Sequence, residues 1–352
     1  MSHPLPVPMT DVRTGSLAWL WPGYIPKGKL TILDGDPNLG KSLTTLDLAA
    51  RWSRGQTFPD GAGAGTIGRT LIIQVEDGTA DTVLPRLQAA GADLANVFVL
   101  PDESARVFRL PWNTPWLEQA IRESNASLVV IDPFLSFLSR RVWATSDQSV
   151  RRVLGKLAEV AKQTGAAIML IRHLNKTEGQ KALYRGGGSI GIVGVARSAL
   201  LAAAHPSGDG RVVLTTTKAN LGPPPPALTY RIVGNESGIA TIAWEGPVDL
   251  TADEALNPPP TEDDKLLMNV ILATEWLMAE LRAGPCPAKE IARAAESAGI
   301  PERTLDRAKK SAHVISTLEV NRKTNERRWI WKLNRDYYEP LEDLPRAPDV
   351  FW

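Results

Sequence analysis

The chain has 352 residues, and its 40 basic and 39 acidic side chains nearly cancel, so the overall charge favours no class of partner. A hydrophobic content of 43% is ordinary for a protein that buries a core, and the length allows one large domain and a smaller one. Cys286 is the only cysteine, which excludes an internal disulfide. With no signal peptide after Met1 and no apolar run of about 18 residues, we expect a cytoplasmic protein without a membrane span.

Short apolar strands alternate with helices over residues 29–250. The expected strands are 29–34, 70–75, 96–100, 128–131, 167–171, 199–203 and 211–217, and the expected helices are 42–53, 79–91, 116–124 and 150–164. This alternation predicts an α/β fold, with a mostly parallel sheet covered by helices on both faces. Residues 1–28 are expected to be a lead-in, residues 251–264 a proline-rich acidic linker and residues 336–352 a tail.

A phosphate-binding loop follows the first of these strands. Residues 35–42 read Gly-Asp-Pro-Asn-Leu-Gly-Lys-Ser, with a strand before them and a helix after them. Two glycines let backbone N–H groups turn inward around phosphates, and the helix directs its positive end at them. We expect Lys41 against the β- and γ-phosphates of ATP and the Ser42 hydroxyl on Mg²⁺. The residues expected to bind the nucleotide are Gly35, Asp36, Pro37, Asn38, Leu39, Gly40, Lys41, Ser42 and Leu43.

Three polar residues end other strands, at the sheet edge where open α/β sheets bind ligands. Asp132 follows four apolar residues, and we expect it to hold Mg²⁺ from a strand beside the phosphate-loop strand. Hydrolysis also needs a group that orients water, and Pro133 and Phe134 cannot serve, which favours Glu76 on the second strand. His173 ends the fifth strand and is expected to sense the γ-phosphate, although a lone histidine can also be structural.

Together these motifs resemble the RecA-like ATPases and, more narrowly, the RepA-type hexameric replicative helicases and related ATPases of plasmids, phages and integrated elements. The resemblance covers about residues 17–250 and rests on residues 35–42, 74–77, 128–133, 171–176, 184–189 and 217–222. It implies that Glu76 is the catalytic base and that His173 couples the γ-phosphate to DNA-binding loops.

The resemblance also implies a homo-oligomeric ring, expected to be a hexamer, with ATP at each interface and basic residues supplied by a neighbour. Arg185 and Lys218 are the best candidates for that role in trans, with Arg197 behind them. Position 220, where many ring helicases have an arginine, is Asn220, so the identity of the finger stays open. Gly186 to Gly188 predict a mobile loop that exposes Arg185, which would allow it to reach another subunit.

Two segments combine cations with aromatic residues, as single-stranded DNA requires for its phosphates and bases. Residues 136–149 contain Arg140, Arg141 and Trp143, and residues 177–189 contain Lys181, Tyr184 and Arg185. We expect these segments to line a channel for one strand, although plain surface loops would have the same composition.

Residues 265–335 predict a separate winged helix. Helices are expected at 266–281, 287–295 and 301–310, followed by a hairpin of residues 318–320 and 328–333 around a polar tip at 321–325. Ten basic and three acidic residues lie between Arg303 and Arg335, a net charge of +7 that suits duplex DNA. The same module could instead contact a protein.

The sequence thus favours an ATP-hydrolysing enzyme that acts on DNA, as a ring helicase or translocase in the replication of a mobile element. The alternative is a DNA-binding regulator or helicase loader, in which nucleotide sets the oligomeric state without translocation. A small-molecule kinase would need an arginine-rich lid over the phosphates, and no compact segment suggests one.

Overall fold

The computed structural model describes residues 6–12, 14–63, 65–144, 146–174, 182–188, 191–258, 262–320 and 327–334. The chain separates into two units, Met1–Pro258 and Pro259–Trp352, and each has a hydrophobic core of its own. Lys181, the tip at 321–325 and the tail at 336–352, all named in the sequence predictions, lie outside the described residues.

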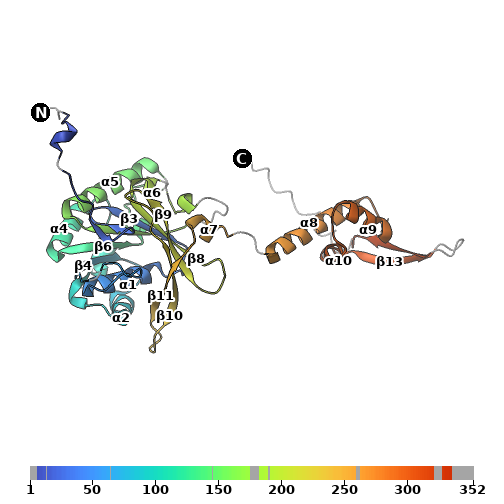
Figure 1. Cartoon of the computed structure of the whole chain (residues 1–352), viewed down its shortest axis with the longest axis horizontal. Coiled ribbons are helices and arrows are strands. Elements are labelled where there is room, and N and C mark those ends of the chain that lie inside the picture. The colour runs from blue at the N-terminus through green and yellow to red at the C-terminus, as the bar shows by residue number, and fades with distance from the viewer. Residues whose placement is uncertain are drawn as a thin grey trace. The chain divides into compact units, whose positions relative to one another are not determined.

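A nine-stranded sheet runs through the described part of the first unit (Figure 1). In spatial order its strands are β11 (Ala240–Val248), β10 (Ala227–Gly234), β9 (Val212–Ala219), β8 (Ser198–Ala204), β3 (Leu30–Gly35), β7 (Ala167–His173), β6 (Ala126–Asp132), β4 (Arg69–Gln74) and β5 (Val97–Val99). The strands from β8 to β5 pair in parallel, whereas β9, β10 and β11 are added in antiparallel order. The predicted RecA-like, mostly parallel α/β fold is confirmed, and β10 and β11 are an antiparallel hairpin that the sequence did not reveal.

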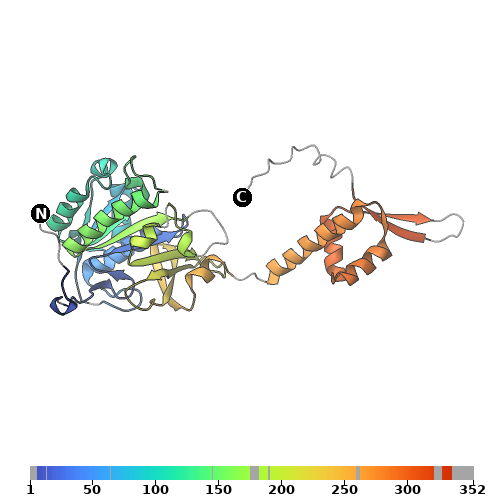
Figure 2. The ribbon, with the colours of Figure 1, turned by 90° about the horizontal axis from the view of Figure 1, so that it is seen from above.

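Helices cover both faces of the sheet, as Figures 1 and 2 show. One face packs against α1 (Lys41–Arg54) and α2 (Leu84–Ala89). The other packs against α3 (Asp102–Val107), α4 (Thr114–Ser124), α5 (Asp147–Thr164) and α6 (Gly191–Val195). Shorter turns of helix occur at Met9–Asp11, Thr79–Val83, Leu94–Asn96, Phe134–Phe137 and Ala182–Tyr184.

The strand β6 shows why the central strands are apolar throughout. Val129 and Ile131 point into the core that α4 and α5 share, while Leu128 and Val130 point into the core beside α1. Successive side chains of a strand alternate between faces, and here both faces are covered, so each position favours an apolar residue.

Residues 19–26, expected to belong to a lead-in, form the small ribbon of β1 (Trp19–Trp21) and β2 (Ile25–Pro26). The rings of Trp21 and Tyr24 stack with centroids 4.0 Å apart, and both side chains are fully buried. Trp21 also donates a hydrogen bond of 3.0 Å to Asp60. The ribbon therefore completes the core on the α1 side of the sheet.

The expected linker begins with ordered structure. Thr251 caps α7 (Ala252–Leu256), and its side chain and that of Glu254 form a reciprocal capping box. Ala252 and Ala255 of this helix are buried against Leu201 and Ala203 of β8. Residues 251–256 are therefore part of the first unit.

The second unit contains α8 (Glu262–Arg282), β12 (Cys286–Pro287), α9 (Ala288–Ser297), α10 (Glu302–Ser311), β13 (Ile315–Val320) and β14 (Arg327–Lys332). Its strands form an antiparallel sheet in the order β12-β14-β13. Its core includes Leu277, Ile291, Leu305 and Trp331. The three helices and the hairpin thus occur where the sequence placed them.

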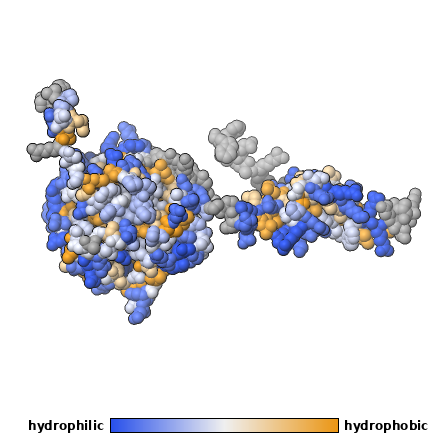
Figure 3. All heavy atoms as spheres, viewed as in Figure 1, coloured by the Kyte–Doolittle hydropathy of each residue, from blue (hydrophilic) through white to orange (hydrophobic). Residues whose placement is uncertain are grey.

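Only the second half of α8 contributes to this core. Leu267 and Leu272 in its first half are 60% and 55% exposed. Figure 3 shows hydrophobic residues gathered on the visible face where α8 begins. Among the described residues, no helix combines the length and the hydropathy that crossing a membrane requires.

Candidate active site

Four neighbouring parallel strands, β3, β7, β6 and β4, end at one edge of the sheet. The register places Gly35 beside His173 and Gln74 beside Asp132. Because β7 lies between β3 and β6, the prediction that Asp132 follows a strand beside the phosphate-loop strand is wrong. His173 holds that position, and Asp132 is one strand further away.

The phosphate loop needs its two glycines for different reasons. A side-chain carbon on Gly35 would lie 2.5 Å from the carbonyl oxygen of Ala202, so only glycine allows β3 and β8 to approach so closely. Gly40 adopts a left-handed conformation with φ of 72°, which glycine adopts at least cost. The helix α1 then begins without a side-chain cap, so its first N–H groups remain available to an anion.

The Ser42 hydroxyl and the Asp132 carboxylate lie in direct contact, since Ser42 Oγ donates a hydrogen bond of 2.6 Å to Asp132 Oδ2. Burial raises the pKa of the Asp132 carboxyl to about 6, and the charge of Glu76 adds to the shift while the bond from Ser42 opposes it. Two oxygen donors therefore meet at a point where the positive charge of Lys41 only partly opposes the effects of burial and of Glu76. This is the environment that a hard divalent cation such as Mg²⁺ stabilises.

Lys41 folds back onto its own loop. Its ammonium group donates a hydrogen bond of 2.7 Å to the carbonyl oxygen of Asp36, and the residue is 6% exposed. Burial lowers the pKa of Lys41, and the nearby carboxylates, Asp132 first, oppose that shift. The carbonyl of Asp36 occupies the position around Lys41 that an anionic phosphate oxygen could take.

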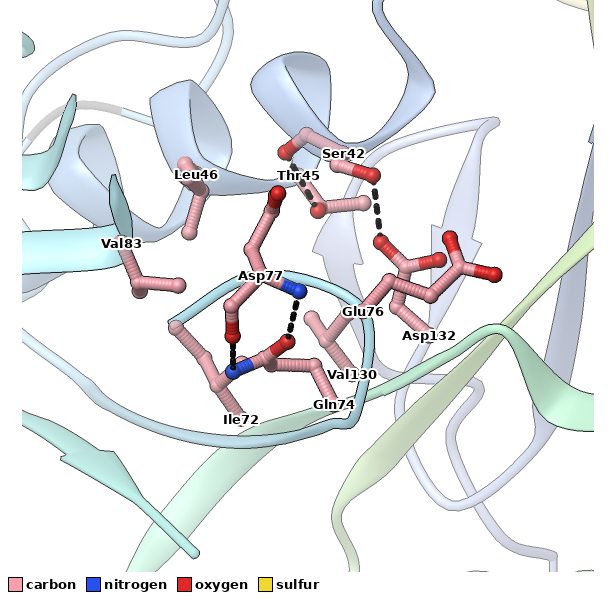
Figure 4. Close-up of a pocket in the computed structure, with 10 residues that line it drawn as sticks. All are labelled: Ser42, Thr45, Leu46, Ile72, Gln74, Glu76, Asp77, Val83, Val130 and Asp132. Carbon is pink, nitrogen blue, oxygen red and sulfur yellow. Dashed lines mark hydrogen bonds between the residues drawn. The ribbon is translucent and has the colours of Figure 1, made fainter. Parts of the chain in front are cut away.

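Glu76 and Asp77 have different surroundings although they are adjacent. Asp77 forms an ion pair of 2.7 Å with Arg86. Its backbone is fixed by Gln74, whose side-chain amide donates to the Asp77 carbonyl at 2.6 Å and accepts from the Asp77 N–H at 2.9 Å. Figure 4 shows the Glu76 carboxylate on the Asp132 side of the pocket, and the Asp77 carboxylate turned away from it. Glu76 is therefore the member of the pair that faces the Ser42–Asp132 contact.

His173 also faces this cluster. Its Nδ1 is buried and has no hydrogen-bond partner among the described residues. Burial lowers the pKa of His173, and the charge of Lys41 lowers it further, so the imidazole is neutral at pH 7. A buried polar atom without a partner is uncommon in a folded protein, and this one belongs to the residue that lies beside Gly35 of the phosphate loop.

The unpredicted hairpin β10–β11 forms an outer wall of the phosphate loop. Tyr230 donates a hydrogen bond of 2.6 Å to the carbonyl oxygen of Leu39. A side-chain carbon on Gly40 would lie 2.9 Å from Ile232 Cδ1, so the hairpin touches the loop directly. Trp244 on β11 also donates to Asp47 of α1 at 2.8 Å. The hairpin thus holds both the loop and the helix that follows it.

A buried ion pair lies directly behind the site. Arg172 donates two hydrogen bonds of 2.7 Å to the two carboxylate oxygens of Asp34, and a third of 3.0 Å to the carbonyl of Gly187. Arg172 is 1% exposed and Asp34 is 3% exposed. A side-chain carbon on Gly186 would lie 1.8 Å from the Arg172 guanidinium, so that position also requires glycine. This pair was not predicted from the sequence, although a charged residue beside each of two apolar strands was the available signal.

Arg185 and Lys218 do not join the cluster. Arg185 is only 8% exposed, which contradicts the prediction of an exposed loop side chain. The reason is local pairing, since Leu174 bridges to Gly186 and the Gly187 N–H donates to the His173 carbonyl at 2.8 Å. Lys218 donates to the carbonyls of Val193 and Gly194, at 2.7 and 3.0 Å, near the end of α6.

Arg140, Arg141 and Trp143, expected in a channel loop, are exposed, Trp143 by 72%. Of the second expected channel segment, residues 177–189, the structure describes residues 182–188, and Lys181 lies outside them.

Comparisons with known proteins agree with this geometry. A family profile described as AAA domain matches residues 4–179. DNA repair protein RadA of Bacillus subtilis is 25% identical over 171 residues, which are 48% of this chain and 33% of that protein. RadA of Halalkalibacterium halodurans is 28% identical over 48% of this chain and 33% of its own length. RadA of Chlamydia muridarum is 24% identical over 50% of this chain and 37% of its own length. The likeness therefore spans about a third of these relatives.

Replacing Arg172 by methionine should destabilise the first unit by about 3–5 kcal/mol, because it leaves the Asp34 carboxylate buried without a partner. The double variant Arg172→Met/Asp34→Leu should lose less, since no charge remains buried. Urea unfolding followed by near-ultraviolet circular dichroism measures both losses. The control is Arg122→Met, which removes an exposed ion pair with Glu118 and should cost at most about 0.5 kcal/mol. A double variant no more stable than Arg172→Met would contradict this account.

Proposed function

Because the chain belongs to the AAA domain family, we propose that it is an Mg²⁺-dependent ATPase that acts on DNA. The observation that carries the proposal is the contact between Ser42 Oγ and Asp132 Oδ2, at the edge where Lys41, Glu76 and His173 also meet. Relatives named as DNA repair proteins support DNA as the partner. Their similarity covers about half of this chain and a third of each relative, so the work done on DNA is inferred separately below.

The residues present fit a magnesium ion and a nucleotide. Ser42 and Asp132 supply the oxygen donors that Mg²⁺ prefers, and the remaining ligands would be phosphate oxygens and water. When bound, Mg²⁺ neutralises charge that develops on the transferred phosphoryl group. Lys41 can exchange the Asp36 carbonyl for a phosphate oxygen without leaving its buried position. The N–H groups at the start of α1, which have no side-chain cap, would hold the other phosphate oxygens.

We assign the orientation of the attacking water to Glu76. Its neighbour Asp77 forms an ion pair with Arg86, and the side chain of Gln74 fixes the backbone of Asp77. Glu76 is left as the carboxylate of the pair that faces the site. His173 is proposed to contact the γ-phosphate through its unpartnered Nδ1, because a neutral imidazole can donate one hydrogen bond there.

Glu76→Gln should lower the rate of ATP hydrolysis by about 10²- to 10⁴-fold while nucleotide binding persists, because the amide keeps the size of the side chain but cannot accept a proton. Phosphate release and binding of a fluorescent ATP analogue measure the two properties. Asp77→Asn is the matched control and should retain most activity. If instead Asp77→Asn abolishes hydrolysis and Glu76→Gln does not, the assignment passes to Asp77.

We propose that subunits form a homo-oligomeric ring, with a hexamer as the expected size, in which Arg185 or Lys218 completes a neighbour's site. In the free chain Arg185 Nε is buried without a hydrogen-bond partner among the described residues. Burial lowers the pKa of Lys218, and the charges of Arg197 and Arg151 add to the shift. Both cations would therefore gain from an anion supplied across an interface.

Mixing Arg185→Ala with Lys41→Ala subunits should restore hydrolysis, because each subunit type supplies what the other lacks. The finger in such sites contributes about 10³- to 10⁵-fold to the rate, so recovery is measurable above the two inactive parents. Lys218→Ala is mixed in the same way. If neither mixture recovers although sedimentation shows mixed oligomers, neither residue acts in trans.

We propose two DNA contacts for this enzyme. Arg140, Arg141 and Trp143 are exposed and suit a single strand, since cations pair with phosphates and an indole stacks on bases. The second unit, which we interpret as a winged helix, offers α10 to duplex DNA with Arg303, Arg307 and Lys310. A ring with these contacts could serve as a helicase or translocase in the replication of a mobile element.

Single-stranded DNA should stimulate the ATPase of the full chain several-fold if hydrolysis drives translocation. Arg141→Ala/Trp143→Ala should reduce this stimulation and leave basal hydrolysis unchanged, because both side chains lie outside the phosphate site. Slow hydrolysis with no response to single strands would favour the alternative, a nucleotide-regulated DNA-binding regulator or helicase loader. A coupled ATPase assay with and without oligothymidine separates the two.

A further inference from the structure

The hairpin of the second unit carries large apolar side chains in solvent. The register of β13 and β14 pairs Leu318 with Trp329 and Val320 with Arg327. Trp329 is 55% exposed, Leu318 45% and Val320 46%. Directly opposed residues of an antiparallel pair lie on the same face, so these three residues form one surface, here called the hairpin face.

The hairpin face looks toward the side of the unit that holds α10. Trp331 lies two residues beyond Trp329 on the same strand, so the two rings point to the same side of the sheet. The Trp331 ring is buried, and Lys309 of α10 lies over it with Nζ 4.3 Å from the ring centroid. Figure 2 shows the hairpin projecting away from the helices of this unit. The hairpin face therefore continues outward from a ring that already contacts a cation of α10.

Positively charged side chains lie on β14 itself and on the helix α10. Arg327 lies opposite Val320, and α10 adds Arg303 and Lys310, both exposed. An indole bordered by cations suits a partner that combines negative charge with flat apolar rings. Nucleic acid has both, since its phosphates pair with cations and its bases stack on aromatic rings.

The exposed indole of Trp329 favours single-stranded over double-stranded nucleic acid. In a duplex, the bases stack on each other and offer only their edges to a protein. An unpaired base offers its whole face, which an exposed indole can cover. A wing that only touched the duplex backbone would gain nothing from Trp329 or Leu318, because phosphates require cations.

We propose that the hairpin face binds unstacked bases of single-stranded DNA, while Arg327 and the cations of α10 bind the phosphates on either side. This inference rests on the proposed function, because it takes DNA as the partner. It changes the substrate of the second unit from duplex alone to DNA that contains an unpaired segment. The unit would then hold the strand on which the ATPase acts.

The test measures binding of the full chain to a fluorescein-labelled oligothymidine and to a duplex of the same length, by fluorescence anisotropy. Trp329→Ala should weaken single-strand binding by roughly 5- to 100-fold, the range that loss of one base–ring contact gives, and leave duplex binding within about twofold. Trp329→Phe should retain most of the affinity. The control Trp112→Ala removes a tryptophan that is 60% exposed in the first unit and should change neither affinity.

Leu318→Ser provides a second, independent variant of the hairpin face and should act in the same direction as Trp329→Ala. Unchanged single-strand affinity in both variants, or equal weakening on both DNA forms, would overturn the inference while leaving a role on DNA intact. A wild-type chain that binds neither DNA form would overturn both the inference and the proposed partner. A change of oligomeric state in sedimentation, with DNA affinity unchanged, would show instead that a second copy covers this surface.

Discussion

The buried pairing of Arg172 with Asp34 is the constraint on which the site depends. Removing two charges from water is costly, and the cost is offset only when every strong donor and acceptor finds a partner. Here the guanidinium donates two hydrogen bonds to the Asp34 carboxylate and a third to the Gly187 carbonyl. Asp34 immediately precedes the phosphate loop, and Arg172 immediately precedes His173. One side chain thus fixes the loop that would hold phosphate, the strand that carries the imidazole and the glycine-rich segment beside Arg185.

The charged and polar groups at this edge of the sheet are imperfectly matched by one another. Burial raises the pKa of Asp132 and the charge of Glu76 adds to the shift, while the charge of Lys41 opposes it only in part. Lys41 meanwhile contacts a neutral carbonyl, and His173 leaves a ring nitrogen unused. A metal–nucleotide complex would supply positive charge to the carboxylates and negative charge to Lys41 at the same time. On the proposed function, part of the binding energy of the nucleotide would come from relieving these imbalances.

The parallel strands and the phosphate loop could be predicted because their causes are local. Buried strands favour apolar residues at every position, and the loop needs glycine at fixed spacing. Other features have causes distant in sequence. The glycines at 186–188 predicted a mobile loop that exposes Arg185. Gly186 is in fact required because the Arg172 guanidinium fills the space where a side chain would begin. The strands β10 and β11 escaped prediction because the hairpin has few fully buried positions and follows a proline-rich segment that indicates a break.

That hairpin lies outside the region that identifies the family, although it contacts the phosphate loop. The family match ends at residue 179, whereas Tyr230, Ile232 and Trp244 reach back to the phosphate loop and α1. A fragment that ended at residue 179 would contain the whole segment that matches the family profile. It would lack the hairpin β10–β11, which forms the outer wall of the phosphate loop. During synthesis, the hairpin emerges about 190 residues after the loop, since Leu39 and its partner Tyr230 are 191 positions apart. The phosphate-loop motif is therefore synthesised well before the hairpin that supports it, and the motif alone does not make the complete site.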